Sequence, residues 1–222
     1  MSTRFRLFLI TFGALIVAAT FTFPQWQHLL TPQDQGETVE VLSGLAPELR
    51  PTFEALPAEQ QGAYRQAASV NPAVGLAMVN AALQPPIEVP EVEQALPSMS
   101  GPIEVAVGEF TRLDAIRWAL GDVVVYQQAD NSKVLRFESF SVVNGPNLHV
   151  ILSGRTADTL LQGTPLPGEL AGNDVDLGAL KGTLGAQNYD VPPELDISSY
   201  NSVLIVSQSL NIIYSIAPLF AA

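Results

Sequence analysis

The chain has 222 residues, enough for one large domain or for a smaller domain with attached segments. Hydrophobic residues make up 47% of it and charged residues only 14%, and the formal net charge is −12. A body this acidic repels phosphate backbones, so we expect no nucleic-acid partner. Because the chain contains no cysteine, disulfides, thiolate metal ligands and thiol redox chemistry are excluded.

The first predicted element is an N-terminal membrane anchor within residues 1–30. Arg4 and Arg6 precede an uncharged apolar run, Leu7 to Phe23, which as a helix would be about 26 Å long. Positive charge before the run predicts a single-pass protein of the cell membrane with its C-terminal body outside the cytoplasm. A cleaved signal peptide is the alternative, since Val17-Ala18-Ala19 is an acceptable site. We favour the retained transmembrane helix because apolar residues continue to Phe23.

Residues 31–83 predict a short α-helical hairpin. Asn71-Pro72 ends one helix and starts the next, with Asn71 as its N-cap. Helical spacing places four apolar residues of the second helix on one stripe: Val74, Ala77, Met78 and Ala81. We interpret this stripe as a packing face of the hairpin rather than as a cofactor face.

Residues 84–102 are rich in proline, which predicts a stiff, extended linker and places a domain boundary there. From residue 103 to 222 the apolar pattern has a period of two. Strand-like runs lie at 123–126, 134–140, 148–152, 202–207 and 210–216. Short strands separated by polar turns predict a mainly β domain, an antiparallel β-sandwich or a barrel-like fold.

The stretch from Val175 to Pro192 is punctuated by Gly178, Gly182 and Gly185. Glycine at such positions permits a positive φ or a close approach to another strand, so we expect a loop of specific shape. The spacing matches neither dinucleotide nor Walker phosphate loops. We interpret Lys181 as a partner that fixes this motif loop.

Several motifs occur together in one order and carry a family resemblance. They are Asn144-Gly-Pro-Asn-Leu-His-Val-Ile-Leu-Ser153, Asp176-Leu-Gly-Ala-Leu-Lys-Gly182, Gly185-Ala-Gln-Asn-Tyr-Asp-Val-Pro192 and Tyr200-Asn-Ser-Val-Leu-Ile205. Together they resemble the DM-thirteen domain family. Members of this family are labelled electron-transfer domains and are sometimes found beside DOMON domains. The resemblance covers about Gly108 to Leu219 and implies a compact, β-rich extracytoplasmic domain.

Three departures from the family pattern bear on function. The resemblance places a cysteine in the penultimate strand, where this chain has Ser207, and a serine hydroxyl has no thiol redox chemistry. A histidine is usual three residues after an aspartate near the domain start, whereas Asp114 is followed by Arg117, which is not a metal ligand. The usual Gly-Pro-Asp ends here in Asn147, which keeps the turn but removes a carboxylate.

The most site-like polar residues are amides and a phenol. They are Asn144, Asn147, Gln187, Asn188 and Tyr189. If the loops gather at one end of the domain, these side chains line a polar concavity; alternatively, they hydrogen-bond their own backbone as turn residues. His149 is a further candidate, with a structural role as the alternative.

The sequence offers partial support for two other chemistries, hydrolysis and Ca²⁺ binding. A Ser/His/Asp hydrolase would combine His149 and Ser207 with an aspartate, but the sequence has no nucleophile-elbow motif. Asn173, Asp174 and Asp176 place oxygen ligands close together for Ca²⁺, yet no EF-hand spacing follows, so we interpret them as a polar turn.

The sequence therefore predicts a membrane-anchored, extracytoplasmic β domain that binds an unknown ligand and is not an enzyme. Its expected partners are the membrane, through the N-terminal helix, and an envelope or cell-surface protein. The alternatives are an electron-transfer module with a cofactor held by His149, Asn147 or Tyr189, and a calcium-dependent adhesion module. No metal or cofactor is assigned.

Overall fold

The structure, a computed structural model, describes residues 42–99, 101–162 and 171–222. Within it, Gly44–Ala222 form one compact unit. The predicted anchor, residues 1–30, lies outside the described residues. Among the helices that are described, none is both long and apolar enough to cross a membrane.

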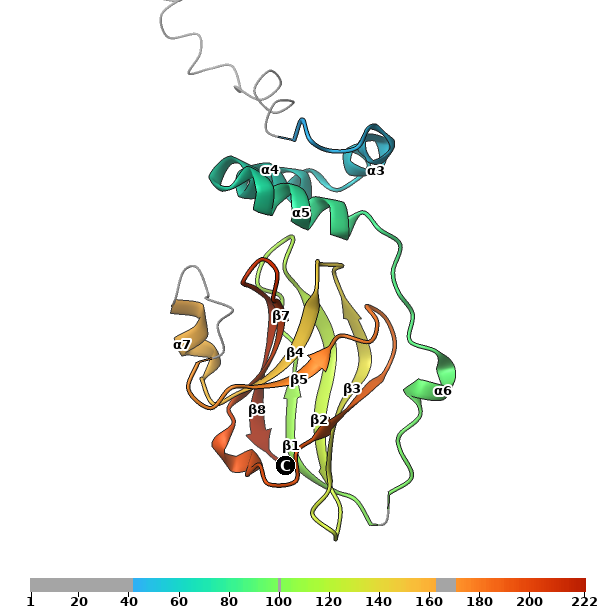
Figure 1. Cartoon of the computed structure of the whole chain (residues 1–222), viewed down its shortest axis with the longest axis vertical. Helices are drawn as coiled ribbons and strands as arrows, with labels where there is room; N and C mark the ends of the chain where they lie inside the picture. Colours follow the sequence, from blue (N-terminus) through green and yellow to red (C-terminus); the bar gives the residue numbers. More distant parts are fainter. Residues whose placement is uncertain (1–41, 100, 163–170) are drawn as a thin grey trace, which may run out of the picture. The chain divides into compact units, whose positions relative to one another are not determined.

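Eight antiparallel strands of the described chain form one sheet that curls into a nearly closed barrel (Figure 1). The strands are β1 (Ile103–Glu109), β2 (Ala119–Gln127), β3 (Lys133–Val142), β4 (Leu148–Ser153), β5 (Val175–Ala179), β6 (Gln187–Val191), β7 (Ser202–Ser207) and β8 (Ile212–Ala221). Their order around the sheet is β5-β4-β7-β8-β1-β2-β3-β6, so β5 and β6 form its two edges. The mainly β, antiparallel prediction is confirmed, and of its two architectures the barrel is the one observed.

The alternation predicted for residues 148–152 is present in β4. Val150 and Leu152 are fully buried on one face, while Ile151 on the other face packs against Leu160 of α7 (Ala157–Gln162). In the core, the rings of Phe110, Phe137 and Phe140 lie 4.8–5.3 Å apart between centroids. Alternate side chains of β4 therefore point into the barrel and toward an outer face that α7 covers.

The stretch from Val175 to Pro192 is more than a loop, because it contains the two edge strands β5 and β6. The sequence pattern predicts neither of them as a strand, because such short segments beside glycines show no clear alternation. Gly178 and Gly185 have φ angles of 113° and 99°, as expected for glycines with positive φ. The last strand begins at Ile212 rather than at residue 210.

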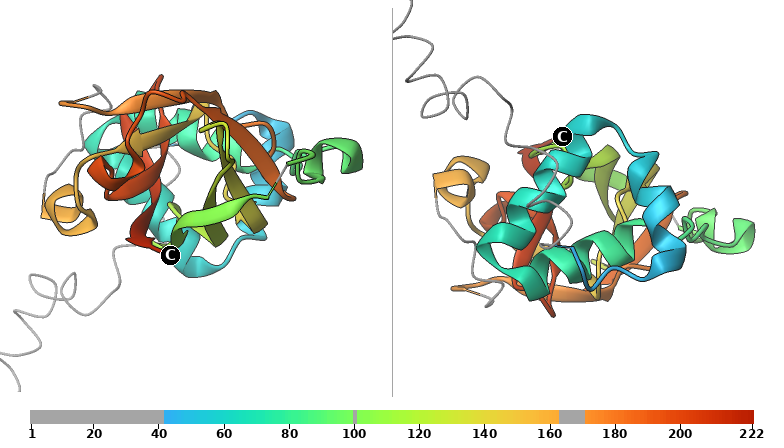
Figure 2. Two further views of the ribbon diagram at one scale, coloured as in Figure 1. Left: turned by 90° about the horizontal axis from the view of Figure 1, so that it is seen from below. Right: turned by 90° about the horizontal axis from the view of Figure 1, so that it is seen from above.

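Short helices precede the barrel: η2 (Pro47–Leu49), α3 (Arg50–Glu54), α4 (Ala58–Val70) and α5 (Pro72–Ala82). Residues 44–83, which we name the helical cap, lie over one end of the barrel (Figures 1 and 2). The Asn71 carboxamide accepts a hydrogen bond of 3.3 Å from Val74 N, which confirms the predicted N-cap. Met78 of the predicted stripe is buried, as a packing residue would be.

The proline-rich segment is held against the barrel along much of its length, and includes α6 (Glu91–Gln94). Thr183 and Ile87 form two hydrogen bonds. The Thr183 hydroxyl oxygen accepts from Ile87 N at 2.9 Å, and Thr183 N donates to Ile87 O at 2.7 Å. Farther along, Asn188 Nδ2 donates to the carbonyl oxygens of Glu93 and Ala95. The predicted linker thus packs against the loop between β5 and β6.

Candidate functional site beneath the helical cap

The antiparallel topology brings four strand connections to the end of the barrel that the cap covers. They are β1–β2 (110–118), β3–β4 (143–147), β5–β6 (180–186) and β7–β8 (208–211). Asn144 Nδ2 fastens this end to the start of the proline-rich segment, directly after the cap, by donating to the carbonyl oxygens of Gln84 and Pro85 at 2.8 and 3.1 Å. The motif that begins at Asn144 and the motif that ends at Gly182 therefore meet at this end of the barrel.

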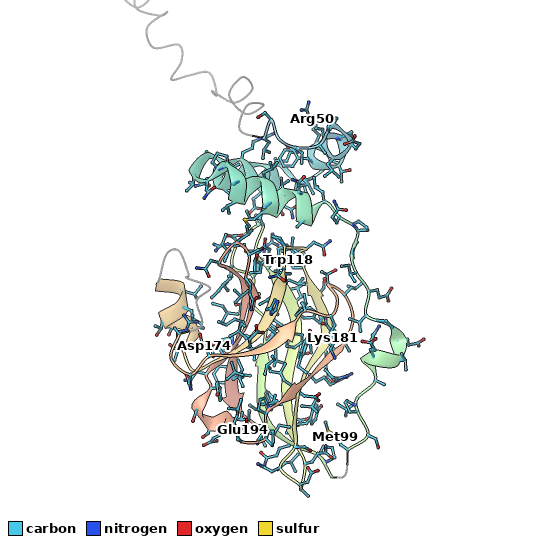
Figure 3. The ribbon with its side chains drawn as sticks, viewed as in Figure 1. Arg50, Met99, Trp118, Asp174, Lys181 and Glu194 are labelled. Carbon is cyan, nitrogen blue, oxygen red and sulfur yellow. The ribbon has the colours of Figure 1, made fainter. Side chains whose placement is uncertain are left out.

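A cavity of about 280 Å³, which we name the cap cavity, lies between the cap and the barrel end. Tyr64 and Gln60 of α4 contribute to one side of it, and Trp118 and Asn144 to the other. Figure 3 shows Trp118 at the barrel end, beneath α5. A second hollow of about 320 Å³ shares Gln84, Asn144 and Thr183 with it.

Three polar side chains that line the cap cavity form no hydrogen bond within the described chain, whereas Asn144 and Thr183 are engaged. Tyr64 is only 2% exposed, yet within the described chain neither its hydroxyl nor the side chains of Gln60 and Trp118 form a hydrogen bond. Among the described residues that line the cavity, none is charged. The cavity thus offers uncharged hydrogen-bonding groups on largely apolar walls.

A second buried phenol lies near this end. Burial raises the pKa of Tyr214, and the neighbouring Tyr64 hydroxyl and Asp114 carboxylate add to the shift. Burial likewise raises the pKa of Tyr64, again with a contribution from Asp114. The Tyr214 hydroxyl is enclosed and has no hydrogen-bond partner in the described chain. Both phenols are therefore neutral at physiological pH.

The positions where the sequence departs from the family pattern are taken up by structural contacts. Asp114 Oδ2 lies 2.7 Å from Arg117 Nε, and its Oδ1 accepts from the backbone N–H of Arg117. Ser207 is fully buried and donates to the carbonyl oxygen of Pro146 at 2.5 Å. Gly145, next to it, makes room for the Tyr214 ring, since a Cβ there would be 2.6 Å from Tyr214 Cζ.

A family model described as "Electron transfer DM13" matches residues 109–219, half of the chain. The chain belongs to the DM13 family. This is the DM-thirteen family of the sequence analysis, so the resemblance is confirmed. No curated protein and no solved structure matches the chain. The helical cap and the proline-rich segment precede the range that the DM13 model matches, so the cap cavity forms between DM13 and non-DM13 residues.

Two of the predicted binding residues of the DM13 domain fix the loop between β5 and β6. Gln187 Oε1 accepts from the backbone N–H of Lys181 at 3.1 Å and from the Tyr189 hydroxyl at 2.7 Å, while Nε2 donates to Gly182 O at 2.7 Å. Gln187 is fully buried and Tyr189 is 3% exposed. Lys181 Nζ donates to Asn188 O at 2.6 Å, as expected for a residue that fixes the loop. This clasp holds residues 181–182 of the β5–β6 loop against β6.

The remaining predicted amides lie in two places: Asn144 and Asn147 at the hollows, and Asn188 against the proline-rich segment. Asn144 lines both the cap cavity and the second hollow, and Asn147 lines the second hollow. Asn188 Oδ1 accepts from Arg136 and its amide holds the α6 segment. Gly182 also lines the second hollow; its Cα lies so near the linker that a Cβ would be 2.7 Å from Ile87 O. The structure thus brings Asn144 and Asn147 together but directs Gln187, Asn188 and Tyr189 to internal contacts.

His149 lies on the outer face of the barrel, separate from both hollows. Its Nδ1 is 3.0 and 3.1 Å from the two carboxylate oxygens of Asp176. Asp176 also accepts from Gly178 N at 2.8 Å and from Gln208 Nε2 at 2.6 Å. This pairing orients the ring but gathers no further ligand around it.

The two aspartates considered for calcium point to different partners. Asp174 forms an ion pair with Arg155 and accepts from Ser153 Oγ at 2.6 Å, whereas Asp176 contacts His149. Across the described residues, no group of three or more histidine, aspartate or glutamate side chains could hold a metal ion.

A third hollow of about 630 Å³, larger than the other two, lies at the opposite end of the barrel. Its polar groups are mostly engaged with one another: Lys133 Nζ donates to Pro193 O at 2.8 Å and Asn131 Nδ2 donates to the same oxygen at 2.9 Å. Because these groups are satisfied, the cap cavity is the better candidate despite its smaller volume. Sequence reasoning missed Tyr64, Gln60 and Trp118, since no local pattern distinguishes a cavity-lining side chain from a packed one.

Proposed function

We propose that this DM13 protein is a non-catalytic binding module whose binding site lies at the capped end of the barrel. The proposal depends on the contacts of Arg117 and Ser207, which stand where the family resemblance places a histidine and a cysteine. One is paired with Asp114 and the other hydrogen-bonds Pro146, so neither provides a redox group. The unused polar groups of the cap cavity support binding at this end.

The module is membrane-anchored and extracytoplasmic in this proposal, with the apolar run from Leu7 to Phe23 as a transmembrane helix. The partner is then an envelope or cell-surface component. Fractionation of cells expressing the full chain tests the anchor: we expect it in the membrane fraction after a carbonate wash, and recovery in the soluble fraction would contradict it.

A photo-crosslinking residue tests the binding site in intact cells. Gln84 and Glu194 are both exposed, but Gln84 lines the hollows at the capped end whereas Glu194 lines the opposite end. We expect benzoylphenylalanine at position 84 to give a discrete adduct and the same residue at position 194 to give none. Adducts only at 194, or at neither position, would contradict the proposed site.

The family description favours a second function, electron transfer. It requires a bound redox group, which the optical spectrum of the full chain purified from its native cells would reveal. Absorbance beyond the aromatic band, bleached by dithionite, would establish this alternative and displace the binding proposal. A calcium-dependent module, the weaker alternative, requires a melting temperature that rises with calcium and falls with chelator.

A further inference from the structure

We propose that the cap cavity binds a small, uncharged aromatic molecule bearing one hydroxyl group. The inference rests on the proposed binding function and narrows it to a ligand class. It also extends the binding role of the chain beyond the DM13 domain, because Tyr64 and Gln60 come from the helical cap.

The lining excludes a charged ligand. No acidic or basic side chain is among the described residues around the cavity, so a buried charge would find no counter-ion there. The chain as a whole carries a net charge of −12, which disfavours anions further. An uncharged ligand avoids both costs.

The size and the walls indicate a flat apolar ligand. A volume of about 280 Å³ lies just below the usual range of small-molecule pockets, roughly 300–1,000 Å³. The rings of Tyr64 and Trp118 offer aromatic contact surface, and Leu56, Pro86 and Val142 extend the apolar wall. A molecule of one or two fused rings matches these dimensions.

The free hydrogen-bonding groups indicate a single polar substituent. The Tyr64 hydroxyl can donate or accept, the Trp118 indole N–H can only donate, and the Gln60 amide can do both. A polar group buried without a partner costs about 1–3 kcal/mol. Tyr64, at 2% exposed and without a partner in the described chain, would gain one from a ligand hydroxyl.

Titration of the purified full-length chain with 1-naphthol tests the inference. The two tryptophans of the chain are Trp26 and Trp118, so a Trp26→Phe background makes Trp118 the sole tryptophan reporter. We expect saturable quenching of Trp118 emission, and isothermal titration calorimetry should give one site per chain. A linear, non-saturating response would overturn the inference.

Three variants locate the binding. Tyr64→Phe removes one hydroxyl and should weaken binding about 3- to 10-fold, as the loss of one neutral hydrogen bond does. Ala82→Phe fills the cavity and should abolish binding. Tyr214→Phe removes a hydroxyl that is enclosed and outside the lining, so it should leave affinity unchanged. Equal affinity in wild type and Tyr64→Phe, with both folded by circular dichroism, would overturn the assignment even if Ala82→Phe fails to fold.

A second ligand tests whether charge prevents binding in the cap cavity. 1-Naphthoate keeps the fused rings but carries a carboxylate, and it should bind at least about tenfold more weakly than 1-naphthol because the cavity lacks a cation. Equal binding would overturn the ligand class. If 1-naphthol does not bind while the crosslinker at position 84 still captures a partner, this inference is wrong and the proposed function stands. If 1-naphthol binds while position 84 gives no adduct, the proposed envelope partner is contradicted and the ligand class stands.

Discussion

The hydroxyl of Ser207 donates a hydrogen bond of 2.5 Å to the carbonyl oxygen of Pro146. The bond joins the end of β7 to the β3–β4 connection, next to Gly145 and the Tyr214 ring. Ser209 contacts the same oxygen at 3.3 Å from an exposed position. The residue that replaces the family cysteine therefore contributes to the capped end through its oxygen.

Ser207→Ala should lower the free energy of unfolding by about 1–3 kcal/mol, because the carbonyl oxygen of Pro146 loses its short, buried donor. Ser209→Ala is the matched control and should cost less than about 0.5 kcal/mol, since its side chain is exposed. Urea denaturation followed by circular dichroism measures both. Equal effects of the two variants would contradict the structural role of Ser207.

Gly145→Ala should destabilise the protein by about 1–3 kcal/mol through overpacking. The added Cβ would lie 2.6 Å from Tyr214 Cζ and 2.9 Å from Leu148 Cδ2. Gly62→Ala, in α4 with no atom within 4 Å of the added Cβ, should instead stabilise it by up to about 1 kcal/mol. Thermal unfolding that shifts in the same direction for both would refute the close approach at Gly145.

Gln187→Leu should release the β5–β6 loop from β6. It leaves Gly182 O without a donor and the Tyr189 O–H without an acceptor, which predicts a loss of at least about 1–3 kcal/mol. Hydrogen exchange by mass spectrometry should show faster exchange in the peptide that contains residues 180–186. Unchanged exchange in that peptide would mean that the clasp does not hold the loop.

Tyr214→Phe should leave stability unchanged or raise it by about 1 kcal/mol, because the hydroxyl it removes is buried and unpartnered in the described chain. Tyr189→Phe should have the opposite sign, since that hydroxyl donates to Gln187 and accepts from Lys181 N. Paired denaturant melts of the two variants measure this difference. A marked loss of stability in Tyr214→Phe would show that its hydroxyl has a partner.

Stability should fall at alkaline pH. Burial raises the pKa of Tyr64, Tyr189 and Tyr214 above the value of about 10 that tyrosine has in an unfolded chain. Above that pH the unfolded state releases protons that the folded state retains, so stability is complete below pH 10 and declines as pH rises. Each such tyrosine contributes a slope of about 1.4 kcal/mol per pH unit. Denaturation between pH 9 and 11.5 should show a shallower slope in Tyr214→Phe; an identical slope would contradict its raised pKa.

Local sequence patterns determined a good part of this fold. The alternation in residues 148–152 predicted the two faces of β4, and Asn71-Pro72 predicted a helix start with its cap. Those features depend on residues close together in the chain, which periodicity and capping chemistry report directly. The motifs between Asn144 and Ile205 likewise sufficed to indicate the family.

Only the tertiary structure decided how these parts meet. The five-residue strands β5 and β6 are defined by their pairing with β4 and β3, and the clasp at Gln187 fixes the loop that connects them. Tyr64 and Trp118, 54 positions apart in the sequence, line one cavity because the cap folds back over the barrel end. Such long-range contacts depend on packing complementarity between distant segments, and a pattern within any one segment carries no record of its partner.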